Sequence, residues 1–245
     1  MKKIVSFAAA ISLYLLFFAY VMYKSLNRDL NFSDYQLYSN VIIKGWFTTV
    51  FISLVSISLS LVIGLIIYLM QESRFKVLHY IAEIHKTLVF ATPLLVIAIV
   101  AYYYIGDSFG IKSKLIIGSL TLGFYISAYI SDIYKGAIES IHINQWQAAK
   151  MFGFTKYQTY RYIIFPQVFK SILPPLAGQF ALTVKSTSLL SYMGTTELLN
   201  SVNKVMASTL KYPEGFTVVS IGYWIITIPL IIMVRKLEVK ANYKV

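Results

Sequence analysis

Six long apolar runs constrain this chain more than any other feature of its sequence. Each run has roughly the 17–25 residues that a helix needs to cross the hydrocarbon core of a bilayer. Only 13% of the 245 residues are charged and 58% are hydrophobic, whereas a soluble domain carries about 25% charged residues. We therefore predict an all-α, polytopic membrane protein with spans at approximately 4–23, 44–70, 86–105, 114–133, 170–192 and 216–234.

The first run follows Lys2 and Lys3 and has some features of a signal peptide. It is long for the apolar core of a signal peptide, and no small-residue cleavage site follows it before Lys24. We expect a retained helix.

The distribution of basic residues predicts how the spans are oriented. With the first residue inside, segments 1–3, 71–86, 132–170 and 235–245 hold 14 Lys and Arg, whereas the opposite loops hold six. Short loops rich in Lys and Arg stay in the cytoplasm. Both termini and the 132–170 segment are therefore predicted to be cytoplasmic, and the formal net charge of +12 needs no nucleic-acid partner.

The second span carries small residues at helical spacing. Ser53, Ser56, Ser60 and Gly64 fall on one face of a helix. Small residues let helix backbones approach closely in lipid. This stripe indicates a helix-packing face, although a chance scatter of serines would look similar.

A polar and aromatic segment, residues 144–166, lies between two of the long apolar runs. It has the spacing x-A-A-x3-G-x9-I-x-x-P, formed by Ala148, Ala149, Gly153, Ile163 and Pro166. Apolar positions before Gly153 recur near helical spacing, and glycine suits the left-handed residue that ends a helix.

The same segment is predicted to form a helix–turn–helix outside the membrane. Thr155 can cap a second short helix after Gly153, and Pro166 stops or kinks that helix. Such a hairpin can seat in a groove of a partner protein. The alternative is an interfacial helix lying on lipid, which Trp146 and the neighbouring aromatic residues would also suit.

Four motifs in order resemble one known family. The 144–166 spacing resembles the loop by which permease subunits of ABC importers dock on their ATPase. Residues 128–153, 91–96 (ATPLLV) and the pair of segments 173–175 (LPP) and 185–190 (KSTSLL) resemble the permeases of polar amino-acid importers. The resemblance covers roughly residues 45–235.

This resemblance implies the type I ABC importer permease core, with about six transmembrane helices. It implies an N-terminal helix and outer loop at 1–43 and a permease domain at 44–245 that contains a cytoplasmic docking loop at 134–168. The docking residues carried over from the family are Gln147, Ala148, Ala149, Phe152, Gly153, Phe154 and Tyr157.

The resemblance also implies a set of partners and a location. They are two ABC ATPase subunits, which bind ATP and Mg²⁺, an extracytoplasmic solute-binding protein and a second permease, either itself or a homologue. The substrate would be a polar amino acid, and the location the bacterial cytoplasmic membrane.

Candidate residues of the translocation path lie in two places. Lys185 is a basic residue inside a predicted span, where charge costs about 2.5–3.5 kcal/mol on insertion scales, so it is a functional candidate. Thr92 and Pro93 lie in the third span, where proline frees a backbone carbonyl or simply kinks the helix. The other candidates are Gln179, Ser186, Thr187 and Ser188.

The chain departs from the family pattern at several positions. Gln147 stands where relatives have Glu before the alanine pair, which removes a charge from the docking contact. Phe90 and Ala91 replace Arg-Gly, Gly178 replaces Asn and Ser186 replaces Asp. These changes leave the type of substrate undetermined, and a partner permease could carry the groups that bind it.

The sequence lacks the motifs of several kinds of chemistry. There is no G-x4-G-K-[ST] sequence to hold ATP phosphates and no H-E-x-x-H among the three histidines, so we expect no ATPase site, no catalytic residues and no metal in this chain. The alternatives to a transport subunit are a channel or receptor-like module without an ATPase, and an intramembrane enzyme. The first leaves the Gly153 loop unexplained, and the second needs a polar catalytic cluster that the sequence does not show.

Overall fold

The computed structural model describes residues 2–26 and 30–242. Every regular element in these residues is a helix, so the predicted all-α fold is confirmed. The elements in chain order are α1 (Lys2–Leu26), α2 (Ser33–Leu37), α3 (Ser39–Gln71), α4 (Lys76–Ala91), α5 (Leu94–Val100), the π-helix η1 (Ala101–Gly106), α6 (Lys114–Glu139), α7 (Ile143–Met151), α8 (Lys156–Gln158), the π-helix η2 (Thr159–Ile164), α9 (Phe165–Ser186), the 3-10 helix η3 (Thr187–Met193), α10 (Leu198–Thr209) and α11 (Tyr212–Asn242).

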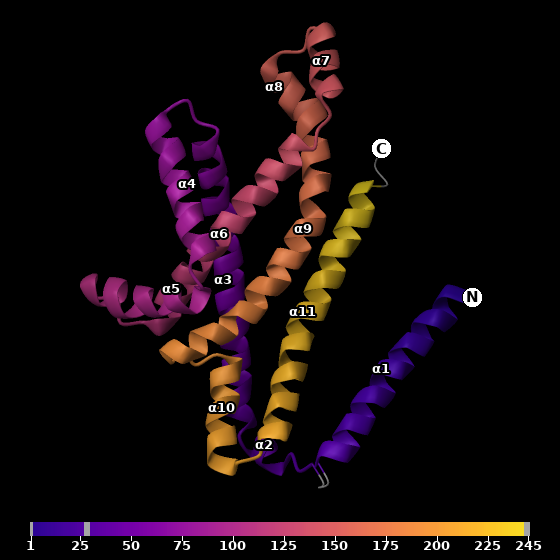
Figure 1. The fold of residues 1–245 in the computed structure, drawn as a ribbon, viewed down its shortest axis with the longest axis vertical. Coiled ribbons are helices and arrows are strands. Elements are labelled where there is room, and N and C mark those ends of the chain that lie inside the picture. The colour runs from indigo at the N-terminus through magenta and orange to yellow at the C-terminus, as the bar shows by residue number, and fades with distance from the viewer. Residues whose placement is uncertain (1, 27–29, 243–245) are drawn as a thin grey trace.

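The helices form an elongated bundle with two different ends. Helices α7 and α8 lie at one end, and α2 and α10 lie at the other (Figure 1). Helix α11 runs between the ends along α9, while α1 lies apart from the bundle beside α11 (Figure 1). We call these the α7 end and the α10 end.

Three of the predicted spans are confirmed as continuous helices. In the part of the chain that the structure describes, α3, α6 and residues 212–240 of α11 are long and apolar enough to cross a membrane. The first predicted span is also helical, and its shorter apolar stretch Ala9–Val21 is exposed along its length.

The span predicted at 86–105 is a pair of helices with a sharp break between them. The chain breaks at Thr92 and Pro93, and the helices on either side differ in direction by 111°. Thr92 is extended (φ −118°, ψ 128°), because the residue before a proline avoids the helical region. Pro93 then begins α5, with its carbonyl accepting from the N–H groups of Val96 and Ile97.

The span predicted at 170–192 also differs from the structure. Helix α9 begins at Phe165, ends at Ser186 and continues as η3, and it is not among the helices apolar enough to qualify as a span. Helix α3 begins at Ser39, so the expected boundary at 43/44 lies inside it, and the expected docking loop 134–168 begins within α6 and ends within α9.

The packing face predicted on α3 is confirmed. Ser53, Ser56, Ser60 and Gly64 are all buried, and α3 packs along α6. Ser56 Oγ donates to the carbonyl of Ser119 on α6 at 3.0 Å. Small residues therefore bring the two backbones close together.

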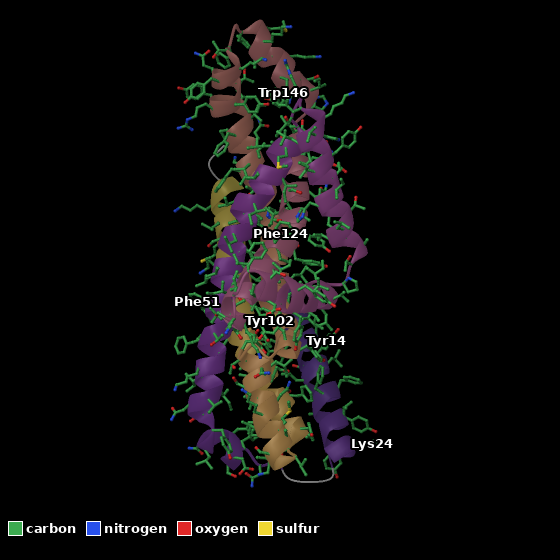
Figure 2. The ribbon with its side chains drawn as sticks, turned by 90° about the vertical axis from the view of Figure 1, so that its left-hand side faces the viewer. Tyr14, Lys24, Phe51, Tyr102, Phe124 and Trp146 are labelled. Atoms are coloured by element: carbon green, nitrogen blue, oxygen red, sulfur yellow. The ribbon has the colours of Figure 1, made fainter. Side chains whose placement is uncertain are left out.

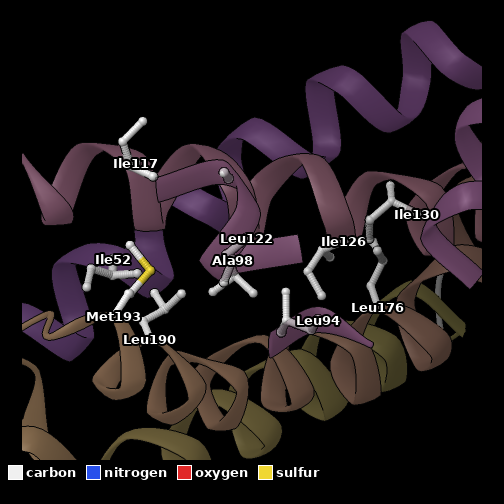
Figure 3. Close-up of a cluster of buried hydrophobic side chains, with 11 residues drawn as sticks. Ile52, Leu94, Ala98, Ile117, Leu122, Ile126, Ile130, Leu176, Leu190 and Met193 are labelled. Carbon is white, nitrogen blue, oxygen red and sulfur yellow. The ribbon is translucent and has the colours of Figure 1, made fainter. Parts of the chain in front are cut away.

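The main apolar core joins α3, α5, α6, α9 and η3. Figure 3 shows the core side chains of α5, Leu94 and Ala98, among those of α6, α9 and η3. Leu122 and Leu190 are fully buried there. This core fixes α5 against the bundle after the break at Pro93.

Candidate functional site

The turn after α7 has the geometry that its sequence predicts. Gly153 has φ +75°, in the left-handed region. Its N–H donates to the carbonyl of Lys150 at 3.1 Å, and the N–H of Phe154 donates to that of Ala149 at 3.0 Å. This pair of bonds is the Schellman motif, which satisfies the last carbonyls of a helix, so Gly153 ends α7 as predicted.

The predicted cap of the second helix is also present. Thr155 Oγ1 accepts from the N–H of Gln158 at 3.3 Å, and Gln158 Oε1 accepts from the N–H of Thr155 at 2.8 Å. This reciprocal capping box fixes the direction in which the chain leaves the turn. Residues 143–158 therefore form a short helical hairpin, which we call the docking hairpin.

The docking hairpin presents aromatic side chains outward. Phe152 is 81% exposed, Tyr157 74% and Phe154 42%. The two alanines divide, since Ala148 is exposed and Ala149 is buried against its own chain. Ala149 thus packs the hairpin, whereas Ala148, Gln147 and the rings belong to its outer surface.

An aromatic contact holds the hairpin to the bundle. The rings of Trp146 and Tyr160 lie edge to face with centroids 5.3 Å apart, and Trp146 lies toward the α7 end (Figure 2). Such ring pairs contribute about 0.5–1.5 kcal/mol beyond the area they bury. Tyr160 belongs to η2, which leads directly into α9, so the hairpin is connected to both α6 and α9.

Thr92, one of the two translocation candidates between α4 and α5, borders an apolar cavity. Thr92, Val96 and Phe124 are among the residues that line about 490 Å³ of space between α3, α5 and α6. Its walls offer almost no polar atoms, so it does not suit a zwitterionic ligand. Pro93 is exposed, and the helix that it begins packs against η3.

The candidates on α9 and η3 differ in their exposure. Lys185 is exposed in the last turn of α9, nearer the helix end than the sequence suggests, and Ser188 Oγ donates to its carbonyl at 2.7 Å. Gln179 and Ser186 are half-buried, whereas Thr187 is buried and donates to the carbonyl of a residue in the preceding turn. Polar side chains within a membrane-spanning segment avoid lipid and face protein or water.

The structure also reveals a buried carboxylate that the sequence reading did not select. Glu197 is fully buried and caps α10, accepting from the N–H groups of Leu199 at 3.0 Å and Asn200 at 2.7 Å. Tyr223 of α11 donates to it at 2.8 Å, and Thr49 of α3 donates at 3.4 Å.

Glu197 therefore ties three helices together at the α10 end. Burial raises the pKa of its carboxyl above the ordinary value, against the opposing effect of the hydrogen bonds. A signal was available in the sequence, because Glu197 stands immediately before the run that forms α10, at the position where a side chain caps a helix.

Within the described residues, no three side chains of His, Cys, Asp or Glu lie close enough together to hold a metal ion. The arrangement is that of a helical bundle with an exposed hairpin at one end and an exposed lysine, Lys185, at the end of α9.

Comparison with known proteins places this arrangement in a family. Residues 60–242 match the family model "Binding-protein-dependent transport system inner membrane component". The chain is 30% identical over 213 residues to the probable glutamine ABC transporter permease protein GlnM of Bacillus subtilis (strain 168), an alignment that covers 87% of this chain and 97% of that one. It is 31% identical over 193 residues to the histidine/lysine/arginine/ornithine transport system permease protein HisQ of Salmonella typhimurium, covering 74% and 84% of the two chains.

Solved structures share the fold. A chain in the crystal structure of an amino acid ABC transporter with histidines superposes with a TM-score of 0.79 at 25% identity, covering 87% of this chain and all of that chain. A chain of the MetNI methionine ABC transporter superposes with a TM-score of 0.65 at 15% identity, covering 80% and 95%. From the family match over residues 60–242 and these relatives, the chain belongs to the binding-protein-dependent transport system inner membrane component family.

Proposed function

We propose that this chain is the membrane-spanning permease subunit of an ATP-driven importer of a polar amino acid, and that the docking hairpin couples it to a separate ATPase. The observation that carries the proposal is the hairpin itself, with its left-handed Gly153 and exposed Phe152 and Tyr157 at one end of the bundle. Exposed rings on a rigid turn fit the groove of a partner protein. Family membership and the amino-acid permeases among the relatives support the same function.

The partners follow from this function. Two ATPase subunits supply the ATP and Mg²⁺ sites, an extracytoplasmic solute-binding protein delivers substrate, and a second permease, self or homologue, completes the path. The family description, a binding-protein-dependent system, supports the solute-binding partner. The relatives include both a glutamine permease and a histidine/lysine/arginine/ornithine permease, so the substrate class proposed is a polar amino acid without a named member.

The location proposed is the bacterial cytoplasmic membrane, with the α7 end in the cytoplasm and the α10 end outside. Helix α1 runs from Lys2 toward α2, and α11 returns toward the α7 end (Figure 1), which supports both termini on the cytoplasmic side. The charge bias between the two sets of loops supports the same orientation. Residues 1–43 add a helix and outer loop to the permease domain 44–245.

The path proposed lies along the face of α9 and η3 that exposes Lys185. Lys185 and Gly178 are exposed on α9, and Gln179 is half-exposed beside them. A lysine and an amide facing lipid would be costly, so this face opens to a second permease or to an aqueous cavity. Closure of the ATPases on ATP would push the docking hairpin and switch the access of this cavity between the two sides of the membrane.

The Gly153→Asp variant tests the docking role. The substitution adds a negatively charged side chain to a left-handed turn on the surface that faces the partner. Within this chain nothing lies within 4 Å of the added Cβ. We expect the variant to lose the ATPase on co-purification, or to lose the stimulation of ATP hydrolysis by substrate. The measurement uses the permease co-expressed with its partner ATPase.

Gly110→Asp is the matched control. Gly110 also has a positive φ (+66°) and open space around it, but it lies in the turn between η1 and α6. This control should retain the ATPase and the stimulation. If Gly153→Asp retains both as well, the docking role is wrong.

A further inference from the structure

Helix α4 is held to the rest of the chain by little apolar packing. Of its 16 residues, only Ala82 and Val89 are buried. Tyr80, Ile84 and Leu88 are about 60% exposed and point away from the bundle core. The position of α4 therefore depends on its two connections, on its polar contacts and on the ring contacts of His85 with Phe124 and of Phe90 with Tyr129.

An ion pair joins α4 to α6. Lys86 Nζ of α4 lies 2.5 Å from Asp132 Oδ1 of α6, and the Lys86 side chain is only 12% exposed, against 46% for Asp132. Removing one member of such a pair leaves a poorly solvated charge, which costs more than the pair itself contributes. Helix α4 is therefore expected to follow α6 when α6 moves.

Two further polar contacts define how α4 sits between its neighbours. His85 Nε2 lies 3.3 Å from Ser127 Oγ of α6, and Gln71 Nε2 of α3 donates to Glu83 Oε1 at 2.6 Å. These contacts align α4 with both neighbouring helices. The bond to the Glu83 carboxylate contributes about 1.5–3 kcal/mol, as hydrogen bonds to charged groups do, and the His85–Ser127 bond about 1 kcal/mol, while Lys86 and Asp132 form the ion pair between α4 and α6.

The ion pair lies between the docking hairpin and the break at Pro93. Asp132 stands about two helical turns before the end of α6, from which the chain passes into α7. Lys86 stands less than two turns before Thr92, where the chain turns by 111° into α5. Figure 1 shows α4 beside α6 on the side of the bundle from which α5 projects.

We propose that the Lys86–Asp132 ion pair transmits movement of the docking hairpin through α6 to α4, and so to the Thr92–Pro93 hinge that positions α5 beside η3. Both are positioning residues, because neither touches substrate or nucleotide. The inference rests on the docking role proposed for the hairpin. A contact that only lies between two sites is not evidence of coupling, so the pair must be tested as a pair.

The experiment measures uptake per ATP hydrolysed in liposomes that contain the whole importer. Lys86→Met and Asp132→Asn each remove one charge and keep the side-chain length. We expect each to lower uptake per ATP about tenfold, within the roughly 5- to 150-fold range typical of coupling between sites. The double variant should take up no less substrate per ATP than the more impaired single variant, because all three variants remove the same interaction.

The reversed pair, Lys86→Asp with Asp132→Lys, should restore uptake per ATP close to that of the unchanged protein. A role in folding alone would instead lower the amount of protein recovered and leave uptake per ATP unchanged. Lys76→Met is the matched control, because Lys76 is exposed at the start of the same helix. It should have no effect.

The outcomes separate this inference from the docking role. If the ATPase co-purifies and hydrolysis continues while uptake per ATP falls and the reversed pair restores it, the coupling contact is supported. If both single variants transport normally, or the reversed pair is as poor as they are, the inference is wrong even where Gly153→Asp confirms docking. Should Lys86→Met be recovered in low yield, Asp132→Asn carries the test alone, because Asp132 is half-exposed.

Discussion

At the α10 end of the bundle Glu197 is fully buried and bonded to side chains of α3 and α11, whereas at the α7 end Phe152 is 81% exposed. The difference extends to the backbone. A Cβ at Gly45, near the α10 end, would collide with Ser201 and with the carbonyl of Glu197, while a Cβ at Gly153 would meet nothing in this chain. The α10 end is packed closely against its own chain, whereas the hairpin at the α7 end is exposed.

This contrast matches the mechanical demands on a permease. Polar contacts from α2 to the neighbouring segments add to the α10 end, including the ion pair of Lys211 and Asp34 at 2.5 Å and the bond from the Tyr35 hydroxyl to the Lys211 carbonyl at 2.6 Å. Together these contacts connect α2, α3, α10 and α11, and such networks stiffen the part of a fold that they join. At the α7 end the hairpin is held by the Trp146–Tyr160 contact, by the hydrogen bond from Thr159 Oγ1 to the Thr155 carbonyl at 3.0 Å and by the helix ends.

The largest effect expected concerns which end faces the cytoplasm. A topology reporter fused after residue 245, which lies outside the described residues, should report the cytoplasm, and one fused after Leu210, between α10 and α11, should report the outside. The reason is the excess of Lys and Arg on the side of the α7 end. Reports from the same side for both fusions would overturn the assignment of the two ends.

The next largest effect concerns stability and distinguishes the two ends directly. Gly45→Ala places a methyl group against Ser201 and should destabilise the protein by about 1–3 kcal/mol, the usual cost of overpacking. Gly136→Ala is the matched control on α6, where nothing lies within 4 Å, and it should stabilise by about 0.5–1 kcal/mol. The measurement is the thermal unfolding midpoint of each purified variant in the same detergent. Equal midpoints would show that the α10 end is less tightly packed than the contacts indicate.

Much of the docking hairpin could be predicted from the sequence because its determinants are local. Gly153 and Thr155 act within three or four residues of themselves, and both do what their residue types predict. The stripe of small residues on α3 was equally predictable from the sequence, because the helical period places Ser56 and Ser60 on the same face.

Features that depend on distant partners were not predictable in the same way. The pairing of Lys86 with Asp132 joins positions on separate helices, and Glu197 draws donors from α3 and α11 as well as α10. The direction that the chain takes after Pro93 was not predictable for a related reason. Proline predicts a break, but packing of Leu94 and Ala98 into the core determines where α5 goes afterwards.

The smallest effect expected is at Lys185, where α9 leads through η3 toward the packed α10 end. Lys185→Met keeps the length of the side chain and removes its charge. Lys185 is exposed in the last turn of α9. Its positive charge there interacts favourably with the C-terminal end of the helix dipole and with any negative group on the other side of the path. We expect the maximal rate of transport to fall about fivefold, at the low end of typical coupling effects, while the ranking of substrates stays the same.

The measurement is uptake as a function of substrate concentration for several amino acids, with Lys204→Met, an exposed lysine on α10, as the control. If Lys185 only packs against its surroundings, transport should survive unchanged. If it binds the substrate carboxylate, apparent affinity for every amino acid should fall with little change in maximal rate, because the lost contact would serve binding rather than the cycle. That result would move Lys185 from a gating role to the binding site and would place the substrate at the junction between α9 and η3.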